Sequence, residues 1–246
     1  MEPIYRQKIE IKDIHLDCFG RVKPSVLLYF AQEVSGRHAA LLGTDWEALA
    51  EKKLFWAIIR HHIQVERLPG AGEEITLETW PMPTTRVAYP RATVAYDAQG
   101  NVLFRTAAVW VLMNTETRAM VLPGKSGVVV AGTLRGMELA APSSILPAKL
   151  KHRATRAVGY TELDRNGHMN NTRYLDWVDD LLPSSFHKIH PVREFTVCYL
   201  SEAREGQQLD LSWELSDGPC LQVEAHRQKA DEPDKQERVF AAQIHF

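Results

Sequence analysis

The stretch Leu-Asp-Arg-Asn-Gly-His-Met-Asn-Asn occupies residues 163–171, and a related stretch, Leu-Asp-Cys-Phe-Gly-Arg-Val, occupies residues 16–22. Both copies keep an Asp and a Gly at the same spacing, which is typical of a turn. Their other polar positions differ, because Arg21 stands in the first copy where His168 stands in the second, and Phe19 replaces an Asn. The repeat predicts two copies of one structural unit, of which only the second carries a candidate catalytic loop.

Each copy leads into the same order of secondary structure. After the first copy, apolar residues spaced three and four apart predict a largely buried helix that begins near Pro24 and ends near Gly43. Alternation of apolar and polar residues, broken by turns rich in Gly, Pro and Asn, then predicts an antiparallel meander. Its strands are expected at residues 55–65, 75–79, 87–96 and 102–113.

The second half repeats this order. We expect a strand at residues 149–160, a helix at about 171–182 and further strands at 192–201, 206–215, 219–229 and 237–245. Residues 124–148 lack periodicity and are rich in Gly, Pro and Ser, as is typical of a connector. The sequence therefore predicts an α+β protein with one domain at 1–123, a connector at 124–148 and a second domain at 149–246.

The composition is that of a globular protein with enough apolar residues for a core. Of the 246 residues, 45% are apolar and 24% are charged, and the net charge is −2. No block of Lys and Arg suggests a nucleic-acid partner, whose binding would need a clustered positive face. No apolar stretch reaches the roughly 18 residues that span a membrane, and residues 1–6 do not begin a signal sequence. We therefore expect no nucleic acid, no stable membrane insertion and a cytoplasmic location.

The sequence indicates neither a metal nor a cofactor. The three cysteines, Cys18, Cys198 and Cys220, lack CxxC spacing, so we expect free thiols. His61 and His62 would point to opposite sides of a strand, and they have no evident further ligands. The glycines follow neither the GxGxxG nor the P-loop pattern that binds nucleotides.

Several longer motifs, taken in order, point to a family. Asp164–Tyr174 resembles the signature Asp-x-Asn-x-His-x-Asn-Asn segment of the acyl-(acyl carrier protein) thioesterases, and Tyr199–Glu202 resembles their Tyr-x-x-Glu strand. In the first half, the matching segments are Trp56–Arg60, Glu66–Pro69, Thr79–Pro81 and Trp110–Asn114. The resemblance covers nearly the whole chain. It implies two tandem hotdog domains, each a long central helix wrapped by an antiparallel sheet, of which the N-terminal one houses the acyl chain.

The resemblance also implies a function and a site. Members of this family hydrolyse fatty acyl thioesters of acyl carrier protein (ACP) to free fatty acid without a cofactor, which terminates fatty acid synthesis. Carried over position by position, the proposed catalytic groups fall on Asp164, Asn166, His168 and Glu202. Plant members have a Cys after the Glu, where this chain has Ala203, so a thiol nucleophile is excluded at that position.

Thioester hydrolysis needs an attacking group, a donor for the carbonyl oxygen and a proton for the departing thiol. We expect Asp164 to activate water or to attack directly, and Glu202 to orient water or His168, although the two carboxylates could exchange these roles. Asn166, with the backbone N–H groups that open the following helix, is the expected oxyanion donor. His168 is expected to transfer protons near neutral pH.

Structural explanations compete with this interpretation. Asp-x-x-Gly is ordinary turn chemistry, and Asn170 or Thr172 would cap a helix in a protein without activity. Cys198 would lie about 13 Å from Glu202 along a regular strand, which favours a core thiol over a second nucleophile. Five aromatic residues of the first half could line an acyl pocket or only fill the core: Trp46, Phe55, Trp56, Trp80 and Trp110.

Three other functions stay open at this stage. An acyl-CoA thioesterase would use similar residues, a non-catalytic hotdog protein would bind acyl thioesters without turnover, and a hotdog hydratase or dehydratase would share the fold. The expected partner is ACP, an acidic protein whose docking would use basic residues such as Arg21, Arg165 and Arg173. Hotdog units pair through their sheets, which a tandem chain can satisfy internally, and a homodimer is left open.

Overall fold

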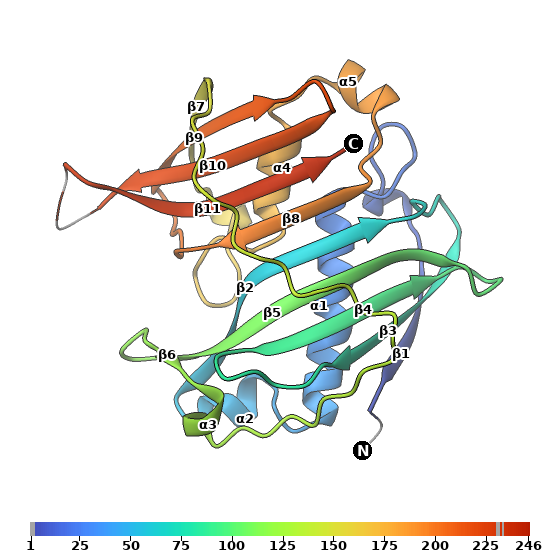
Figure 1. The fold of residues 1–246 in the computed structure, drawn as a ribbon, viewed down its shortest axis with the longest axis vertical. Helices are drawn as coiled ribbons and strands as arrows, with labels where there is room; N and C mark the ends of the chain where they lie inside the picture. The colour runs from blue at the N-terminus through green and yellow to red at the C-terminus, as the bar shows by residue number, and fades with distance from the viewer. Residues whose placement is uncertain (1–2, 230–231, 233) are drawn as a thin grey trace. The chain divides into compact units, whose positions relative to one another are not determined.

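The computed structural model describes residues 3–229, 232 and 234–246, and the chain divides into two compact units, residues 1–142 and 143–246 (Figure 1). In unit 1 the strands form an antiparallel sheet in the order β1-β3-β4-β5-β2. Their bounds are β1 Tyr5–Glu10, β2 Leu54–Val65, β3 Glu74–Pro81, β4 Tyr89–Tyr96 and β5 Val102–Asn114, with the short β6 Met120–Val121 beside β5. The predicted meander is confirmed, and β1 is an addition that the sequence patterns did not indicate.

One long helix lies along a face of this sheet. Helix α1, Pro24–Leu41, begins with a proline in its first turn, where the missing N–H costs nothing, and ends before Gly43, whose φ of +66° suits a glycine. The helix expected at 24–43 is therefore confirmed. Two short helices complete the unit, α2 Trp46–Ala50 and α3 Pro123–Ser126, and Asp45 caps α2 by accepting a hydrogen bond from the Ala48 amide.

Unit 2 repeats the arrangement with strands in the order β8-β11-β10-β9-β7. The strand bounds are β7 His152–Ala157, β8 Glu194–Tyr199, β9 Gln208–Leu215, β10 Cys220–Gln228 and β11 Gln236–His245. Helix α4, Arg173–Asp179, packs on the sheet through Tyr174, whose ring contacts Tyr199 of β8 and Phe240 of β11. The α+β class and the repeated order of elements are confirmed.

The second helix is shorter than the predicted 171–182. Pro183 disfavours the helical conformation of the residue before it, so α4 stops at Asp179 and a separate helix, α5 Ser184–Ile189, follows. Two short 3-10 helices, Asp13–His15 and Tyr160–Glu162, occupy equivalent places before the two Asp-Gly loops. The repeat therefore extends to irregular segments that periodicity does not detect.

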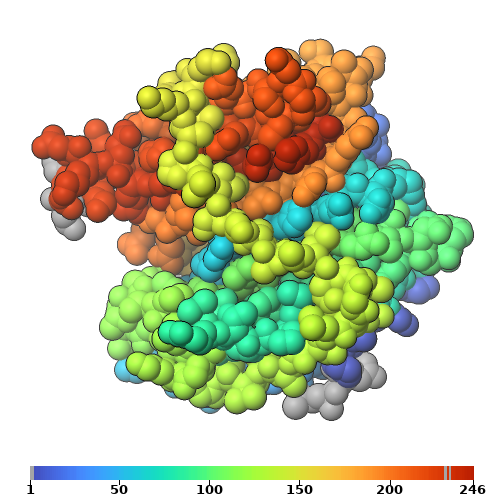
Figure 2. Space-filling view, in the orientation of Figure 1, coloured from blue at the N-terminus to red at the C-terminus, as the bar shows by residue number. Residues whose placement is uncertain are grey.

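Much of the predicted connector is fixed on unit 1. The amide of Thr133 donates to the carbonyl of Pro81 at 2.9 Å, and the Trp80 indole donates to Glu138 at 3.0 Å. Figure 2 shows this light-green segment lying over the strands of the unit. Trp80 is buried beneath it, and Arg135 stacks on the Trp80 ring. The connector thus covers the face of the sheet opposite to α1.

The face of β2 directed into unit 1 contains an unusual titratable group. His61 is 1% exposed, and neither of its ring nitrogens has a hydrogen-bond partner within the described residues. Burial lowers its pKa to about 3, and the neighbouring His62 acts in the same direction. Because the folded pKa lies below the unfolded value near 6.5, the unfolded chain binds more protons between these values, and stability is lost as pH falls below about 6.5.

We predict that the free energy of unfolding falls by about 2–3 kcal/mol through His61 between pH 7 and pH 4.5. His61→Leu should remove this part of the pH dependence, whereas His62→Leu, on the other side of the strand, should leave it in place. Urea denaturation of the three proteins at both pH values measures the difference. Equal pH dependence in the unmodified protein and His61→Leu would contradict the prediction.

Candidate active site

The loop that carries three of the four predicted site residues is closed around Asp164. One carboxylate oxygen, Oδ1, accepts from the amides of Asn166 at 2.8 Å and of His168 at 3.3 Å. The Asp164 amide in turn donates to the His168 carbonyl at 2.7 Å. Gly167 completes the turn with φ of +75°, a conformation that side-chain-bearing residues rarely adopt. Asp164 therefore shapes the loop in addition to any chemical role.

The first copy has the same loop without the same chemistry. Asp17 Oδ1 accepts from the amides of Phe19 at 2.8 Å and Arg21 at 2.9 Å, and Gly20 also has φ of +75°. The Arg21 guanidinium lies 3.0 Å from the Asp17 carboxylate, so this pair is closed within its own loop. The structural explanation of the Asp-x-x-Gly pattern therefore applies to both copies, and catalysis has to be sought in what the second copy adds.

What the second copy adds is a contact between His168 and Glu202. The His168 Nε2 lies 3.2 Å from Glu202 Oε2. The amide of Met169 donates to the carbonyl of Ala203 at 2.8 Å and holds the loop against the chain that follows β8. His168 is buried and Glu202 is half-buried. The structure thus brings a histidine and a carboxylate from two distant segments into hydrogen-bond range.

No equivalent pair exists in the described part of unit 1. The amides of Leu200 and Ser201 both donate to the Val239 carbonyl, and the amides of Glu66 and Arg67 both donate to the Leu103 carbonyl. This correspondence aligns Glu202 with Leu68, an apolar residue. The histidine and the carboxylate are therefore both replaced in the first unit.

Arg227 of β10 fixes the main chain at Glu202. Its guanidinium donates to the Glu202 carbonyl at 2.5 Å, to Gln207 Oε1 at 2.7 Å, to Ser201 Oγ at 2.8 Å and to Glu237 Oε1 at 2.6 Å. Ser201 Oγ also donates to Glu237. Charge-assisted hydrogen bonds of this kind are stronger than neutral ones. Sequence reasoning missed Arg227, because no local pattern indicates that β10 passes beside residue 202.

Tyr174 was quoted in the motif but not predicted as a site residue. Burial raises the pKa of its hydroxyl well above 10, and the negative charges of Asp164 and Glu202 act in the same direction. The positive charge of Arg227 and the Ala203 backbone act in the opposite direction, more weakly than burial. Both predicted carboxylates therefore lie close enough to Tyr174 to affect its ionisation, and the hydroxyl stays protonated near neutral pH.

The predicted oxyanion donors are only partly available. The Thr172 amide and hydroxyl both donate to Asn170 Oδ1, at 2.9 and 2.8 Å, and the Arg173 amide donates to the Asn170 carbonyl. The first amides of the helix are thus engaged with Asn170. The side chain of Asn166 is exposed, and its Nδ2 lies 3.5 Å from Asp164 Oδ2. This amide is positioned at the loop surface.

Other residues considered in the sequence take structural positions. Cys198 is buried in β8, as expected of a core thiol, and Arg173 pairs with Asp176 at 3.0 Å. Trp56 and Trp110 pack in one cluster of unit 1, whereas Trp80 belongs to another. The five aromatic residues therefore do not converge on one pocket. Among the described residues, no group of three or more His, Cys, Asp or Glu is arranged to hold a metal ion.

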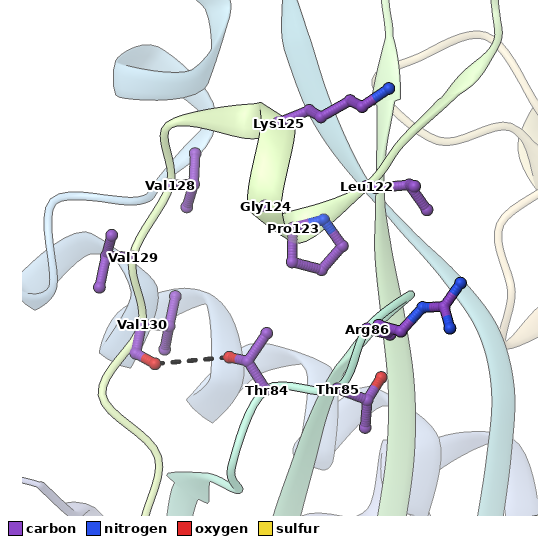
Figure 3. A pocket seen from close by; sticks show the side chains of 10 residues that line it. All are labelled: Thr84, Thr85, Arg86, Leu122, Pro123, Gly124, Lys125, Val128, Val129 and Val130. Atoms are coloured by element: carbon purple, nitrogen blue, oxygen red, sulfur yellow. Dashed lines mark hydrogen bonds between the residues drawn. The ribbon is translucent and has the colours of Figure 1, made fainter.

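A pocket of about 720 Å³ lies in unit 1, and none of the four predicted residues lines it (Figure 3). It is formed by the 84–86 turn and the segments 122–125 and 128–130, and Thr84 Oγ1 donates to the Val130 carbonyl across it at 3.5 Å. The Pro123 ring lies toward its centre, while the cationic ends of Arg86 and Lys125 extend away from the valines. No Asp, Glu, His or Cys of the described chain lines the pocket.

Comparison with protein families covers both units. The model of the acyl-ACP thioesterase N-terminal domain matches residues 2–122, and that of the acyl-ACP thioesterase C-terminal domain matches residues 148–242. This chain belongs to the acyl-ACP thioesterase family. The predicted resemblance, with its tandem hotdog fold, is confirmed.

Individual members of the family are distant relatives. A crystal structure of an acyl-ACP thioesterase from Bacteroides thetaiotaomicron is 25% identical, with a TM-score of 0.87 over 99% of this chain and 98% of that one. The 12:0-ACP thioesterase from Umbellularia californica is 21% identical, with a TM-score of 0.82 over 100% and 97% of the two chains, and supports the fold alone.

A chloroplastic oleoyl-acyl carrier protein thioesterase from Coriandrum sativum is 23% identical to this chain, over 84% of the chain's length. A chloroplastic dodecanoyl-[acyl-carrier-protein] hydrolase from Cinnamomum camphora is 26% identical over 81% of it. The chain spans 61% and 56% of the lengths of these two plant proteins. No helix among the described residues is long and apolar enough to cross a membrane. The cytoplasmic location stays a prediction.

Replacing Arg227 should loosen the chain around Glu202. We predict that Arg227→Met lowers the free energy of unfolding by about 1.5–3 kcal/mol, because several hydrogen bonds to a charged group are lost. Amide exchange at residues 200–203 should become faster. Arg204→Met is the matched control, since the Arg204 side chain is exposed and makes no hydrogen bond within the described residues. Unchanged exchange in Arg227→Met would show that these bonds do not fix the segment.

Proposed function

We propose that this protein hydrolyses fatty acyl-ACP thioesters to free fatty acid and ACP, and so terminates fatty acid synthesis. Membership of the acyl-ACP thioesterase family supports the reaction and its carrier. The observation that carries the proposal is the contact of His168 with Glu202 beside the Asp164 loop. Unit 1 keeps the loop, and its described residues 3–142 contain no such pair beside it, which is the difference expected between a structural copy and a catalytic one.

The geometry supports a specific division of roles. Asp164 Oδ1 is occupied by two loop amides, whereas Oδ2 accepts one hydrogen bond within the described residues, from the Asn166 side-chain amide at 3.5 Å. We therefore assign Oδ2 to the attacking group, either by orienting a water molecule or by direct attack on the thioester carbon. The Asn166 side-chain amide would donate to the carbonyl oxygen as it gains negative charge.

The histidine and the second carboxylate would handle protons. In hydrolysis, the C–O bond to water forms, the C–S bond breaks, and a proton has to reach the departing thiolate. Glu202 holds and orients the His168 imidazole, which accepts the proton from water and delivers it to sulfur. Tyr174, protonated near neutral pH, packs on Tyr199 and Phe240 in the same unit.

The two units would divide the substrate between them. We assign catalysis to the predicted domain at 149–246, and we assign the acyl chain to the predicted domain at 1–123, as the family resemblance implies. The docking of acidic ACP is less well supported by the arginines first considered, because Arg21 and Arg173 each pair with a nearby aspartate. Arg165 is exposed on the candidate loop.

The repeat provides a matched pair of variants for the test. We predict that Asp164→Ala and Asp17→Ala lower the free energy of unfolding to a similar extent, about 1–2 kcal/mol, because each removes the same two loop hydrogen bonds. Only Asp164→Ala should abolish thiol release from a C8 to C18 series of acyl-ACP thioesters. Glu202→Gln, which keeps the size of the side chain, should reduce turnover by a factor of about 10² or more.

Several outcomes would contradict the proposal. Equal loss of activity in Asp17→Ala and Asp164→Ala would mean that the loop acts only through stability. Faster release from the matching acyl-CoA series would identify an acyl-CoA thioesterase. Binding of the thioesters without release of thiol would identify a non-catalytic acyl-thioester-binding protein.

A further inference from the structure

A row of polar side chains crosses the face of the unit 1 sheet that packs against α1. Strand pairing places Thr79 opposite Thr93, and Thr93 opposite Thr106. The adjacent row places Arg91 opposite Ala108, and Ala108 opposite His61. Residues paired directly across strands share a face of the sheet. The strands β3, β4, β5 and β2 therefore each contribute to one polar band in an otherwise apolar core.

Arg91 carries a positive charge into this band without an acidic partner. Its Nη1 lies 3.1 Å from His38 Nδ1 of α1 and 3.4 Å from Thr79 Oγ1, and neither group is an acid. The residue is 8% exposed, and burial alone lowers its pKa to about 10, so the guanidinium stays charged. No Asp or Glu within the described residues pairs with it. Buried arginines are ordinarily paired with an anion, because an uncompensated charge costs several kcal/mol.

Two other buried side chains in the band, those of Thr106 and His61, have polar atoms without a hydrogen-bond partner within the described residues. The Thr106 hydroxyl is buried, with 1% of the residue exposed, and has no partner within the described residues. His61 is equally buried, with both ring nitrogens unpartnered. The Thr93 hydroxyl, by contrast, donates to Thr79 Oγ1 at 3.0 Å. Buried polar groups in native proteins are nearly always satisfied, so an unfilled set beside a buried cation indicates a missing acceptor.

The band is bordered by apolar residues on both sides. On one side, Leu77 pairs with Ala95 and Ala95 with Phe104, all fully buried. On the other side, Tyr89 pairs with Trp110. A ligand at the band would therefore contact hydrocarbon and aromatic surface, which suits an aliphatic chain rather than a free inorganic anion.

We propose that this band, centred on Arg91 and His38 and flanked by Thr106 and His61, is a binding site in unit 1 for a carboxylate carried on an aliphatic chain. The Arg91 fork has the geometry to bind a carboxylate through two parallel hydrogen bonds. His38 of α1, whose Nδ1 lies 3.1 Å from the same guanidinium, borders the site on the helix side.

Two sources of such a carboxylate share this chemistry. One is a free fatty acid, and the other is the far end of a dicarboxylic acyl chain attached to a carrier thioester. The second source rests on the proposed hydrolysis, whereas the first needs only binding. The two ideas can therefore fail independently.

The direct test compares two probes of equal length on the full unmodified chain. Isothermal titration calorimetry with octanoate and octanamide at pH 7.5 separates the charge from the hydrocarbon. We expect octanoate to bind at least ten-fold more tightly than octanamide. Equal affinities, or no binding of either probe, would overturn the proposal without any variant.

Two variants then locate the effect. Arg91→Met keeps a long apolar side chain and should remove the preference for octanoate. Arg86→Met, which removes an exposed cation elsewhere in unit 1, should retain it. If Arg91→Met does not fold, Arg91→Lys replaces it. Lysine cannot form two parallel hydrogen bonds to a carboxylate, so the affinity for octanoate should fall at least five-fold. A preference for octanoate that survives at full strength would overturn the assignment to Arg91.

Turnover distinguishes the two sources. The carrier thioester of a ten-carbon dicarboxylic acid is compared with the plain decanoyl thioester in the unmodified protein and in Arg91→Met. A preference for the dicarboxylic chain that Arg91→Met reverses assigns the site to substrate, whereas no such preference, with octanoate bound, assigns it to free fatty acid. A protein that binds octanoate selectively and releases no thiol would retain the site and disprove the hydrolase. Hydrolysis without selective binding of octanoate would support the hydrolase and disprove the carboxylate site.

Discussion

Packing a helix on one face of an antiparallel sheet is the constraint on which each unit depends. That face has to be removed from water, so its side chains must be apolar or must satisfy one another. In unit 2, α4 meets the constraint with Tyr174 against Tyr199 and Phe240. In unit 1, α1 covers a core that contains Arg91 and three buried threonines. The same architecture therefore accommodates two different interiors, one with aromatic packing beneath its helix and one with a polar row across its sheet.

Comparing the two copies of the Asp-Gly loop shows which of its residues serve the turn and which are available for chemistry. Both units need an acceptor for the loop amides and a residue that tolerates positive φ, and both keep Asp and Gly for these purposes. Arg21 closes the first loop upon itself, whereas His168 extends from the second loop to Glu202. An aspartate shared by both copies is consequently weaker evidence of catalysis than the histidine that differs between them.

Periodicity was sufficient to predict α1 and most strands, because each of these elements buries a regular stripe of apolar residues. It failed for α5 and for the end of α4, where a single proline decides the outcome over a few residues. It also treated residues 130–142 as a connector, since their anchoring to Trp80 depends on contacts distant in sequence. Sequence patterns also missed the Arg227 network and the polar band. Their residues are brought together by strand register, which a single sequence does not specify.

The segment beside the histidine is secured through main-chain atoms. Arg227 donates a hydrogen bond to the carbonyl of Glu202, and the Met169 amide donates one to the carbonyl of Ala203. Neither bond depends on the side chain at position 202 or 203. Substitution at these two positions can therefore alter reactivity while the backbone path is preserved. The main-chain anchors thus separate the position of this segment from the chemistry of its side chains.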